Sequence, residues 1–233
     1  MLHDPARHEP LTPIAWNEDH ARDAIAQIVA GTEAGYSATA YWPLHPRDAD
    51  GGQTQPLLPL YFGACGVAWA LHYLEAVGAC RLVRSYADCV DSLLAPNRQW
   101  LKSSGDTAFA SYMMGDTGIL MLGHWLNPSA TTARLLEDHI AGNLDNPTRE
   151  LMWGSPGTML AALFLHERTG GARWAELFRA SSRKLWSQLL WSDEFQCHYW
   201  TQDMYGQQST YLDAVHGFVA TASPLIRGRH LLG

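Results

Sequence analysis

The chain has 233 residues, of which 47% are hydrophobic and 17% charged, and its formal net charge is −7. This length suits one domain, residues 1–233, and the low charge fraction indicates much internal helix–helix surface. The acidic balance disfavours nucleic-acid binding, no apolar run is long enough to span a bilayer, and the N-terminus shows no secretory signal, so we expect a cytoplasmic protein without a transmembrane segment.

The first predicted element is an amphipathic helix over residues 16–30, followed by a long loop rich in proline and glycine over residues 41–59. Beyond the loop, two kinds of predicted helix alternate. Three are apolar nearly all round, over residues 67–77, 119–126 and 158–165. Three carry one apolar stripe, over residues 82–94, 135–140 and 174–189. A helix that is apolar on every side must be buried on every side, so the alternation predicts inner helices covered by outer ones.

The last part of the chain combines a polar and aromatic loop over residues 191–212 with a final helix over residues 221–232. Runs of alternating polar and apolar residues between hairpin turns are lacking, so strand signals are weak throughout and we expect an all-α fold class. The four cysteines form no C-x-x-C pair, and we expect free thiols.

Each predicted inner helix begins at a pair of glycines or a degenerate form of it. The four motifs are Gly63-Ala-Cys-Gly66, Gly115-Asp-Thr-Gly118, Gly154-Ser-Pro-Gly157 and Gly217-Phe-Val-Ala220. Their repetition indicates a repeat architecture, although the intervals of 52, 39 and 63 residues between first glycines require loops of different length. Glycine allows two backbones to approach closely, and helix N-termini that converge would form a polar floor that tolerates anions.

Four segments together resemble the lanthionine synthetase C-like (LanC-like) family, particularly its eukaryotic-type branch. They are Leu60-Tyr-Phe-Gly-Ala-Cys-Gly, Tyr112-Met-Met-Gly-Asp-Thr-Gly, Glu150-Leu-Met-Trp-Gly-Ser-Pro-Gly and Tyr211-Leu-Asp-Ala-Val-His-Gly. The resemblance covers nearly the whole chain and implies a double-layer α/α-toroid. This chain would supply about four of the family's seven hairpins, so we expect a partial toroid that is incomplete at its C-terminus.

The resemblance also implies a chemistry, the addition of a thiol to dehydroalanine or dehydrobutyrine, which gives a lanthionine bridge or a glutathione thioether. The substrate would be a peptide, together with a glutathione-type thiol. Zinc holds the thiol as thiolate in this family, through a cysteine and a later Cys-His pair that follow the histidine motif. Because the sequence has no counterpart of these ligands, we expect no metal or other cofactor in this chain, and a truncated, inactive form.

The resemblance assigns roles to single residues. His216 matches the motif histidine, which implies proton transfer at the reacting centre. Asp116 has two interpretations, a carboxylate stabilised by the helix N-terminus or a catalytic group. We expect the substrate basin to be lined by Trp153, Ser155, Tyr211 and Asp213. Asp213 and Ala220 replace family glycines. The adjacent Cys197 and His198 precede the histidine motif, and two ligands do not complete a zinc site.

Two other functions stay open at this point. A partial toroid leaves inner helices uncovered, so the chain could be a non-catalytic scaffold that binds a partner or itself. Helical toroids also include carbohydrate-active enzymes, whose chemistry needs paired carboxylates, and Asp116 and Asp213 are the candidates at motif positions.

Overall fold

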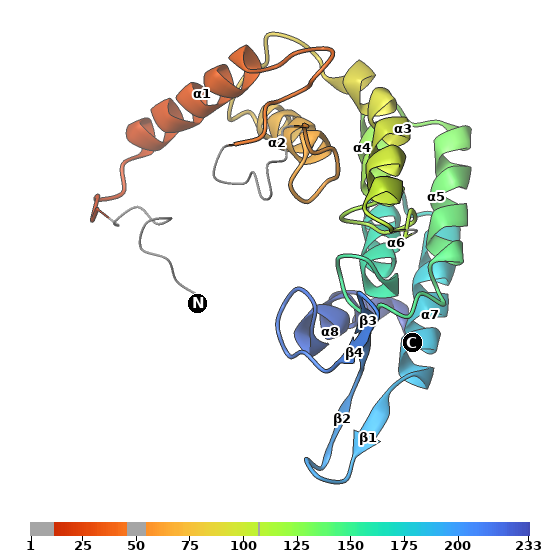
Figure 1. Ribbon diagram of the computed structural model, residues 1–233. Helices are drawn as coiled ribbons and strands as arrows, with labels where there is room; N and C mark the ends of the chain where they lie inside the picture. The colour runs from red at the N-terminus through yellow and green to blue at the C-terminus, as the bar shows by residue number, and fades with distance from the viewer. Residues whose placement is uncertain (1–11, 46–54, 107) are drawn as a thin grey trace.

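The computed structural model describes residues 12–45, 55–106 and 108–233, and these residues are mostly helical (Figure 1). The helices are α1 (Glu18–Ala34), α2 (Ala64–Ala76), α3 (Ala87–Ser103), α4 (Asp116–Leu126), α5 (Ala130–Gly142), α6 (Ser155–Thr169), α7 (Ala172–Ser187) and α8 (Phe218–Arg227), with a 3-10 turn at Arg229–Leu231. The predicted helical class is confirmed. Residues 46–54 of the predicted loop lie outside the described residues.

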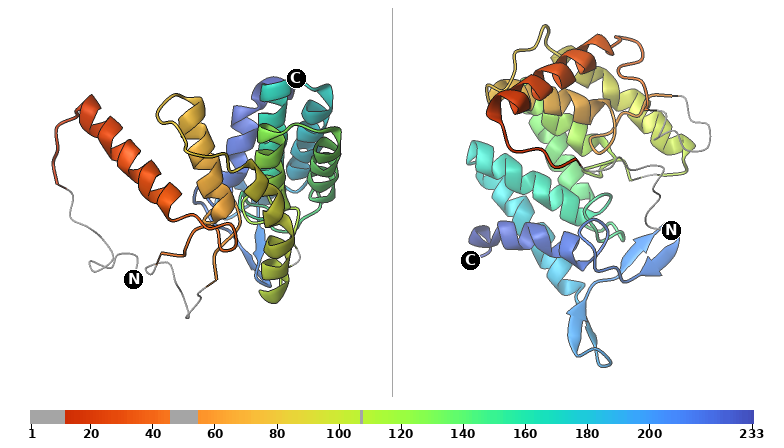
Figure 2. Two further views of the ribbon diagram at one scale, coloured as in Figure 1. Left: turned by 90° about the horizontal axis from the view of Figure 1, so that it is seen from above. Right: turned by 90° about the vertical axis from the view of Figure 1, so that its left-hand side faces the viewer.

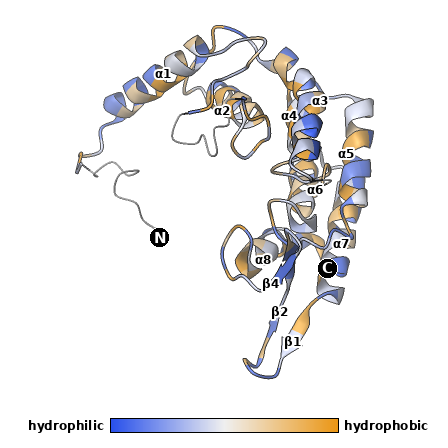
Figure 3. Cartoon of the chain, in the orientation of Figure 1, coloured by the Kyte–Doolittle hydropathy of each residue, from blue (hydrophilic) through white to orange (hydrophobic). Residues whose placement is uncertain are grey.

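The helices are arranged in two layers along an open arc (Figures 1 and 2). Helices α2, α4, α6 and α8 follow one another on the inner side of the arc, and each contacts the next. Helices α1, α3, α5 and α7 lie on the outer side. Outer helices such as α1 and α5 alternate between hydrophilic and hydrophobic turns, as a helix with one apolar stripe does (Figure 3).

The hydrophobic core lies between the two layers. One cluster joins α1–α4 around Leu93 and Ile119, and another joins α4–α8 around Leu163 and Phe178. Helix α6 is the most completely enclosed, because nine of its fifteen residues are buried, as expected of a helix that is apolar nearly all round.

The motif glycines permit close contact between backbones. The N-caps of α2, α4, α6 and α8 are Gly63, Gly115, Gly154 and Gly217, and all four have extended backbone angles. At Gly154 a Cβ atom would overlap with the carbonyl oxygen of Thr148. The second glycines behave alike, since a Cβ at Gly157 would overlap with the carbonyl oxygen of Leu151. Such overlaps explain why glycine stands at the first position of all four motifs and at the last position of the first three.

Backbone hydrogen bonds join the four loops that precede the inner helices. The Tyr61 N–H donates to the Met113 carbonyl at 3.1 Å, and the Met113 N–H donates to the Met152 carbonyl at 3.3 Å. The Leu151 N–H then donates to the Val215 carbonyl at 3.3 Å. The four motifs therefore lie side by side as a ladder, in the same order as in the sequence.

Helix α3 differs from its prediction. The apolar stripe suggested residues 82–94, whereas the helix begins at Ala87 and continues through Pro96 to Ser103. Contacts beyond the proline explain the extension, because Leu101 is buried and the Asn97 side chain donates to the Met114 carbonyl at 3.0 Å. Tertiary packing here outweighs the helix-breaking tendency of proline.

The segment predicted as a loop over residues 191–212 contains four short strands, although strand signals in the sequence are weak. Strands β1 (Leu190–Ser192) and β2 (Cys197–Tyr199) form one antiparallel hairpin, and β3 (Gln202–Met204) and β4 (Gln207–Ser209) form another. The second hairpin turns at Tyr205 and Gly206, both with positive φ. Strands of three residues are too short to show alternation in a sequence.

Candidate functional site

A buried carboxylate and a histidine connect the third and fourth loops. Glu150 is completely buried, and its oxygens accept the backbone N–H groups of Met152 at 2.8 Å and Trp153 at 2.5 Å. His216 directly precedes the N-cap of α8, and its Nδ1 lies 3.0 Å from Glu150 Oε2. These three contacts fix the carboxylate and, through it, the imidazole ring.

Burial and hydrogen bonding act in opposite directions on the pKa of Glu150. Burial raises the pKa of Glu150, and the two backbone N–H groups and His216 oppose that rise. When Glu150 is ionised, Nδ1 of His216 carries the proton that faces it, because a carboxylate only accepts hydrogen bonds. Nε2 is then the ring nitrogen that does not face the carboxylate.

Asp213 shapes the loop that carries His216. Its Oδ1 accepts the backbone N–H groups of Val215 and His216, both at 2.7 Å, and these two bonds lower the pKa of Asp213. Aspartate side chains in turns often accept hydrogen bonds from backbone N–H groups a few residues later. Asp213 therefore fixes the backbone at His216. The resemblance leads one to expect a glycine, not an aspartate, at position 213.

A cavity of about 480 Å³ adjoins His216. It is lined by Met204, Tyr205, Gln207, Ser209, Tyr211, Asp213 and His216. The structure thus brings together three of the six residues predicted for the site: His216, Tyr211 and Asp213.

Trp153 lines a different and larger cavity of about 1290 Å³, which shares Met204 and Tyr205 with the smaller one. The indole N–H of Trp153 has no hydrogen-bond acceptor among the described residues. Ser155 is completely buried at the start of α6 and lines neither cavity. The predicted basin residues are therefore divided between two adjoining cavities and the core.

Asp116 lies apart from His216. It is the first residue of α4 and is completely buried, and its Oδ2 accepts from Arg98 Nε at 2.5 Å and lies 3.2 Å from His139 Nε2. It lines neither cavity, whereas Asp213 lines the smaller one. The pair of carboxylates that glycoside chemistry would need is not brought together.

Some N–H groups of the expected polar floor of helix N-termini are already paired within the chain. The N–H groups of Cys65, Asp116 and Phe218 each donate to a backbone carbonyl seven residues earlier in the sequence, at 3.1, 2.7 and 2.8 Å. N–H groups that already have an acceptor do not bind anions, so these three groups do not contribute to an anion site.

The described residues do not fit the zinc ion that the resemblance implies. They contain no group of three or more His, Cys, Asp or Glu residues able to hold a metal. Cys197 and His198 are neighbours on β2, so their side chains point to opposite faces, and His198 Nδ1 lies 3.3 Å from the Leu190 carbonyl. Cys65 is completely buried, which raises the pKa of its thiol. All four cysteines are free, as expected.

Comparison with known proteins adds no assignment. No family model matches the chain. No curated protein matches it either. Among the described residues, no helix has both the length and the apolar character that crossing a membrane demands.

Three side chains that contact predicted site residues were not themselves predicted: Glu150, Arg98 and His139. Glu150 begins the third motif segment, and the three residues after it are apolar. A carboxylate beside such a run indicates an acidic side chain that is buried together with a partner. Arg98 and His139 lie on the outer helices α3 and α5, and nothing in their local sequence marks them.

Proposed function

We propose that this chain is a LanC-like protein whose helices form part of an α/α-toroid and whose loops bind a peptide at His216. The peptide would carry a dehydroalanine or dehydrobutyrine residue, and the family reaction adds a thiol to it. The observation that supports this most is the Glu150–His216 contact on the fourth of four loops joined in motif order. The equivalent glycine N-caps of the four inner helices support the repeat.

In this proposal His216 provides the proton. A thiolate attacks the β-carbon of the dehydroamino acid, the sulfur–carbon bond forms, and the electrons of the double bond move into an enolate. The enolate α-carbon then takes a proton from Nε2 of protonated His216. Glu150 acts as a positioning residue, since its carboxylate fixes the orientation of the imidazole ring through Nδ1.

The thiolate itself has no source among the described residues, because they lack a fitting metal-ligand group. We therefore derive no step through zinc, and assign to this chain the binding of the peptide and the placement of the proton donor. The thiol, a peptide cysteine or a glutathione-type molecule, would have to be ionised by a group that the described residues do not supply before the addition can proceed.

Peptide binding and thioether formation can be tested separately. We expect the purified chain to bind a fluorescent dehydroalanine peptide by anisotropy, and His216→Ala to weaken binding about tenfold because a charged hydrogen bond is lost. With glutathione added, mass spectrometry should detect no thioether above the uncatalysed rate.

The matched control for His216→Ala is His198→Ala, which removes an exposed histidine from β2 and should leave binding unchanged. A chain that binds no dehydroalanine peptide would refute the proposal. Zinc-dependent thioether formation by the purified chain would refute the proposal that this chain only binds the peptide and places the proton donor.

A scaffold function is the second candidate, and one surface favours it. Trp69 and Tyr73 on α2 are 45% and 48% exposed, and their rings stack at 5.3 Å. Val219 and Ile226 are exposed on α8, the inner helix at the other end of the arc. Exposed apolar groups on inner helices favour association with a partner or a second copy.

A further inference from the structure

We propose that Tyr205 is a peptide-binding residue of the site at His216, and that its ring packs against an apolar side chain beside the dehydroamino acid. The inference rests on the proposed function in that the ligand is a peptide, and it adds the residue that contacts the peptide and the side-chain class that fits there. Its evidence is the backbone, the exposure and the position of Tyr205, which the Glu150–His216 contact does not use.

The backbone at Tyr205 is strained. Its φ is 53°, in the left-handed region that residues with a side chain rarely occupy, and the φ of Gly206 is 75°. Met204 pairs with Gln207 across the hairpin, so these two residues form a two-residue turn with positive φ at both positions. The first position of such a turn favours asparagine, aspartate or glycine. A tyrosine there lowers stability, so formation of the hairpin does not explain it.

Two other non-glycine residues in the described part of the chain have positive φ, and the side chain of each makes a contact within the fold. The Tyr41 hydroxyl lies 2.9 Å from the Ser92 hydroxyl, and Tyr41 packs against the core cluster of α1–α4. The Gln196 amide donates to the Asp193 carbonyl at 2.8 Å. The side chain of Tyr205 is 80% exposed and makes no hydrogen bond or ring contact with any described residue. Its strain is therefore the one that contacts within the fold leave unexplained.

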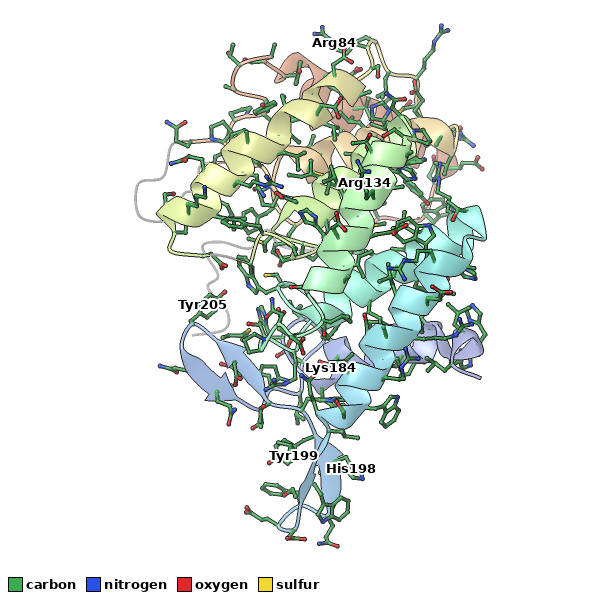
Figure 4. The ribbon with its side chains drawn as sticks, turned by 90° about the vertical axis from the view of Figure 1, so that its right-hand side faces the viewer. Arg84, Arg134, Lys184, His198, Tyr199 and Tyr205 are labelled. Atoms are coloured by element: carbon green, nitrogen blue, oxygen red, sulfur yellow. The ribbon has the colours of Figure 1, made fainter. Side chains whose placement is uncertain are left out.

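The position of Tyr205 supplies a second, independent observation. It stands at the turn between β3 and β4, and it lines both the smaller cavity, together with His216, and the larger one (Figure 4). Strained residues that the fold does not explain gather at binding and active sites. An aromatic ring at the edge of a cavity gains free energy when a ligand removes its surface from water.

The hairpin that carries Tyr205 is fixed to the loops on both sides of the site. The Thr148 hydroxyl donates to the Asp203 carbonyl at 2.7 Å, which joins β3 to the loop before α6. Gln202 is completely buried, and its Oε1 accepts the Tyr211 N–H at 2.9 Å, which joins β3 to the loop before α8. The ring therefore stands on a support that is anchored beside the cavity, which suits it to discriminate between peptides.

The lining of the smaller cavity indicates which side chain fits. Met204, Tyr205 and Tyr211 offer it apolar surface, and His216 offers a polar group. A peptide with its dehydroamino acid at His216 would place a neighbouring residue against the other three side chains. Because aromatic rings and methionine pack well against apolar groups, an apolar neighbour such as leucine should bind better than serine.

The experiment measures peptide binding and thermal stability of the full wild-type chain and of three variants, Tyr205→Phe, Tyr205→Asn and Gln196→Asn. Two fluorescent peptides carry one dehydroalanine with either leucine or serine on both sides, and anisotropy gives their dissociation constants. We expect the wild-type chain to bind the leucine peptide about fivefold more tightly than the serine peptide. Tyr205→Phe should keep this preference, because it keeps the ring.

Tyr205→Asn should reduce the preference to below about twofold. It should also raise the thermal midpoint by about 2 °C, because asparagine suits the left-handed turn position. Gln196→Asn is the matched control, since it places asparagine at a positive φ in the other hairpin, outside both cavities, and should keep the preference. A ring that only supported the hairpin would give the opposite sign, a lower thermal midpoint in Tyr205→Asn.

Equal binding of the two peptides by the wild-type chain would overturn this inference and leave the proposed function standing. The same holds if Tyr205→Asn keeps the leucine preference, if Gln196→Asn loses it equally, or if Tyr205→Asn is less stable than the wild-type chain. If the wild-type chain binds neither peptide, both proposals are refuted.

Discussion

Glu150 performs two tasks with one carboxylate. It accepts two backbone N–H groups of its own loop, which closes the turn before α6, and it holds His216 on the next loop. Burial of the group makes its charged form costly, which is why its pKa is raised despite three favourable contacts. The residue therefore links the stability of the fold to the protonation of the site.

The raised pKa predicts a pH dependence of stability. A carboxyl group whose pKa is higher in the folded than in the unfolded chain adds stability below its ordinary pKa of about 4.5. That stability is lost as the pH rises through the folded value. Relative to Glu150→Gln, which cannot ionise, the wild-type chain should lose unfolding free energy between pH 4.5 and neutrality.

Urea unfolding of both chains at several pH values measures this difference. Asp213→Asn is a control of opposite sign, because the pKa of Asp213 is lowered and its contribution disappears toward acidic pH instead. If the unfolding free energies of the wild-type and Glu150→Gln chains differ by the same amount at every pH, the role given to the buried carboxylate is contradicted.

Single residues of the site were predictable to different extents. His216 could be identified because it stands in a motif beside a helix-opening glycine. Its partner Glu150 lies 66 residues away, and only the side-by-side arrangement of the third and fourth loops brings them together. Asp116 was placed correctly at a helix start, but its contacts with Arg98 and His139 depend on how α3 and α5 pack against α4.

At the scale of elements, helices were predictable wherever apolar residues kept a regular spacing. Helices α4 and α6 match their predicted segments with short extensions at their ends. Helix α3 was misjudged because contacts beyond Pro96 are not local. The hairpins β1–β2 and β3–β4 were missed because their strands are too short for a periodic signal.

The glycine contacts give a prediction for the third inner helix. Gly154→Ala should lower the free energy of unfolding by at least about 3 kcal/mol, because the new methyl group overlaps with the backbone of Thr148, which cannot move without shifting the loop. Chemical denaturation measures the loss.

Gly31→Ala is the control, since Gly31 lies within α1 and a Cβ there meets nothing within 4 Å. That change should stabilise the chain by about 0.5–1 kcal/mol through helix propensity. Equal effects of the two substitutions would show that close approach is not what the motif glycine provides.

At the scale of the whole molecule, the arc leaves the inner helices α2 and α8 at its two ends (Figure 2). Their exposed apolar groups are the surface on which the scaffold candidate depends. The sequence predicted the alternation of enclosed and striped helices, whereas the curvature of the arc depends on how neighbouring layers pack, which no local pattern encodes.

Replacement of Trp69 and Tyr73 by glutamine tests this surface. We expect the wild-type chain to self-associate at micromolar concentration and the double variant to be monomeric, because the apolar area that drives association is removed. Light scattering over a concentration series measures the change.

A second double variant, Trp191→Gln with Phe195→Gln, removes two exposed aromatic rings from the β1–β2 hairpin instead and should associate like the wild-type chain. A wild-type chain that stays monomeric at all concentrations would exclude self-association as the function of the α2 surface.

The hydrogen-bonded loops also set a fixed step between neighbouring repeats. Adjacent backbones joined in this way lie about 5 Å apart, whatever the length of chain that each repeat inserts elsewhere. The side chains that directly precede the motif glycines, from Phe62 to His216, are thus carried by neighbouring backbones. In a chain built on this plan, one of these side chains can be replaced, and the binding preference can change, while the hydrogen-bonded backbones keep their spacing.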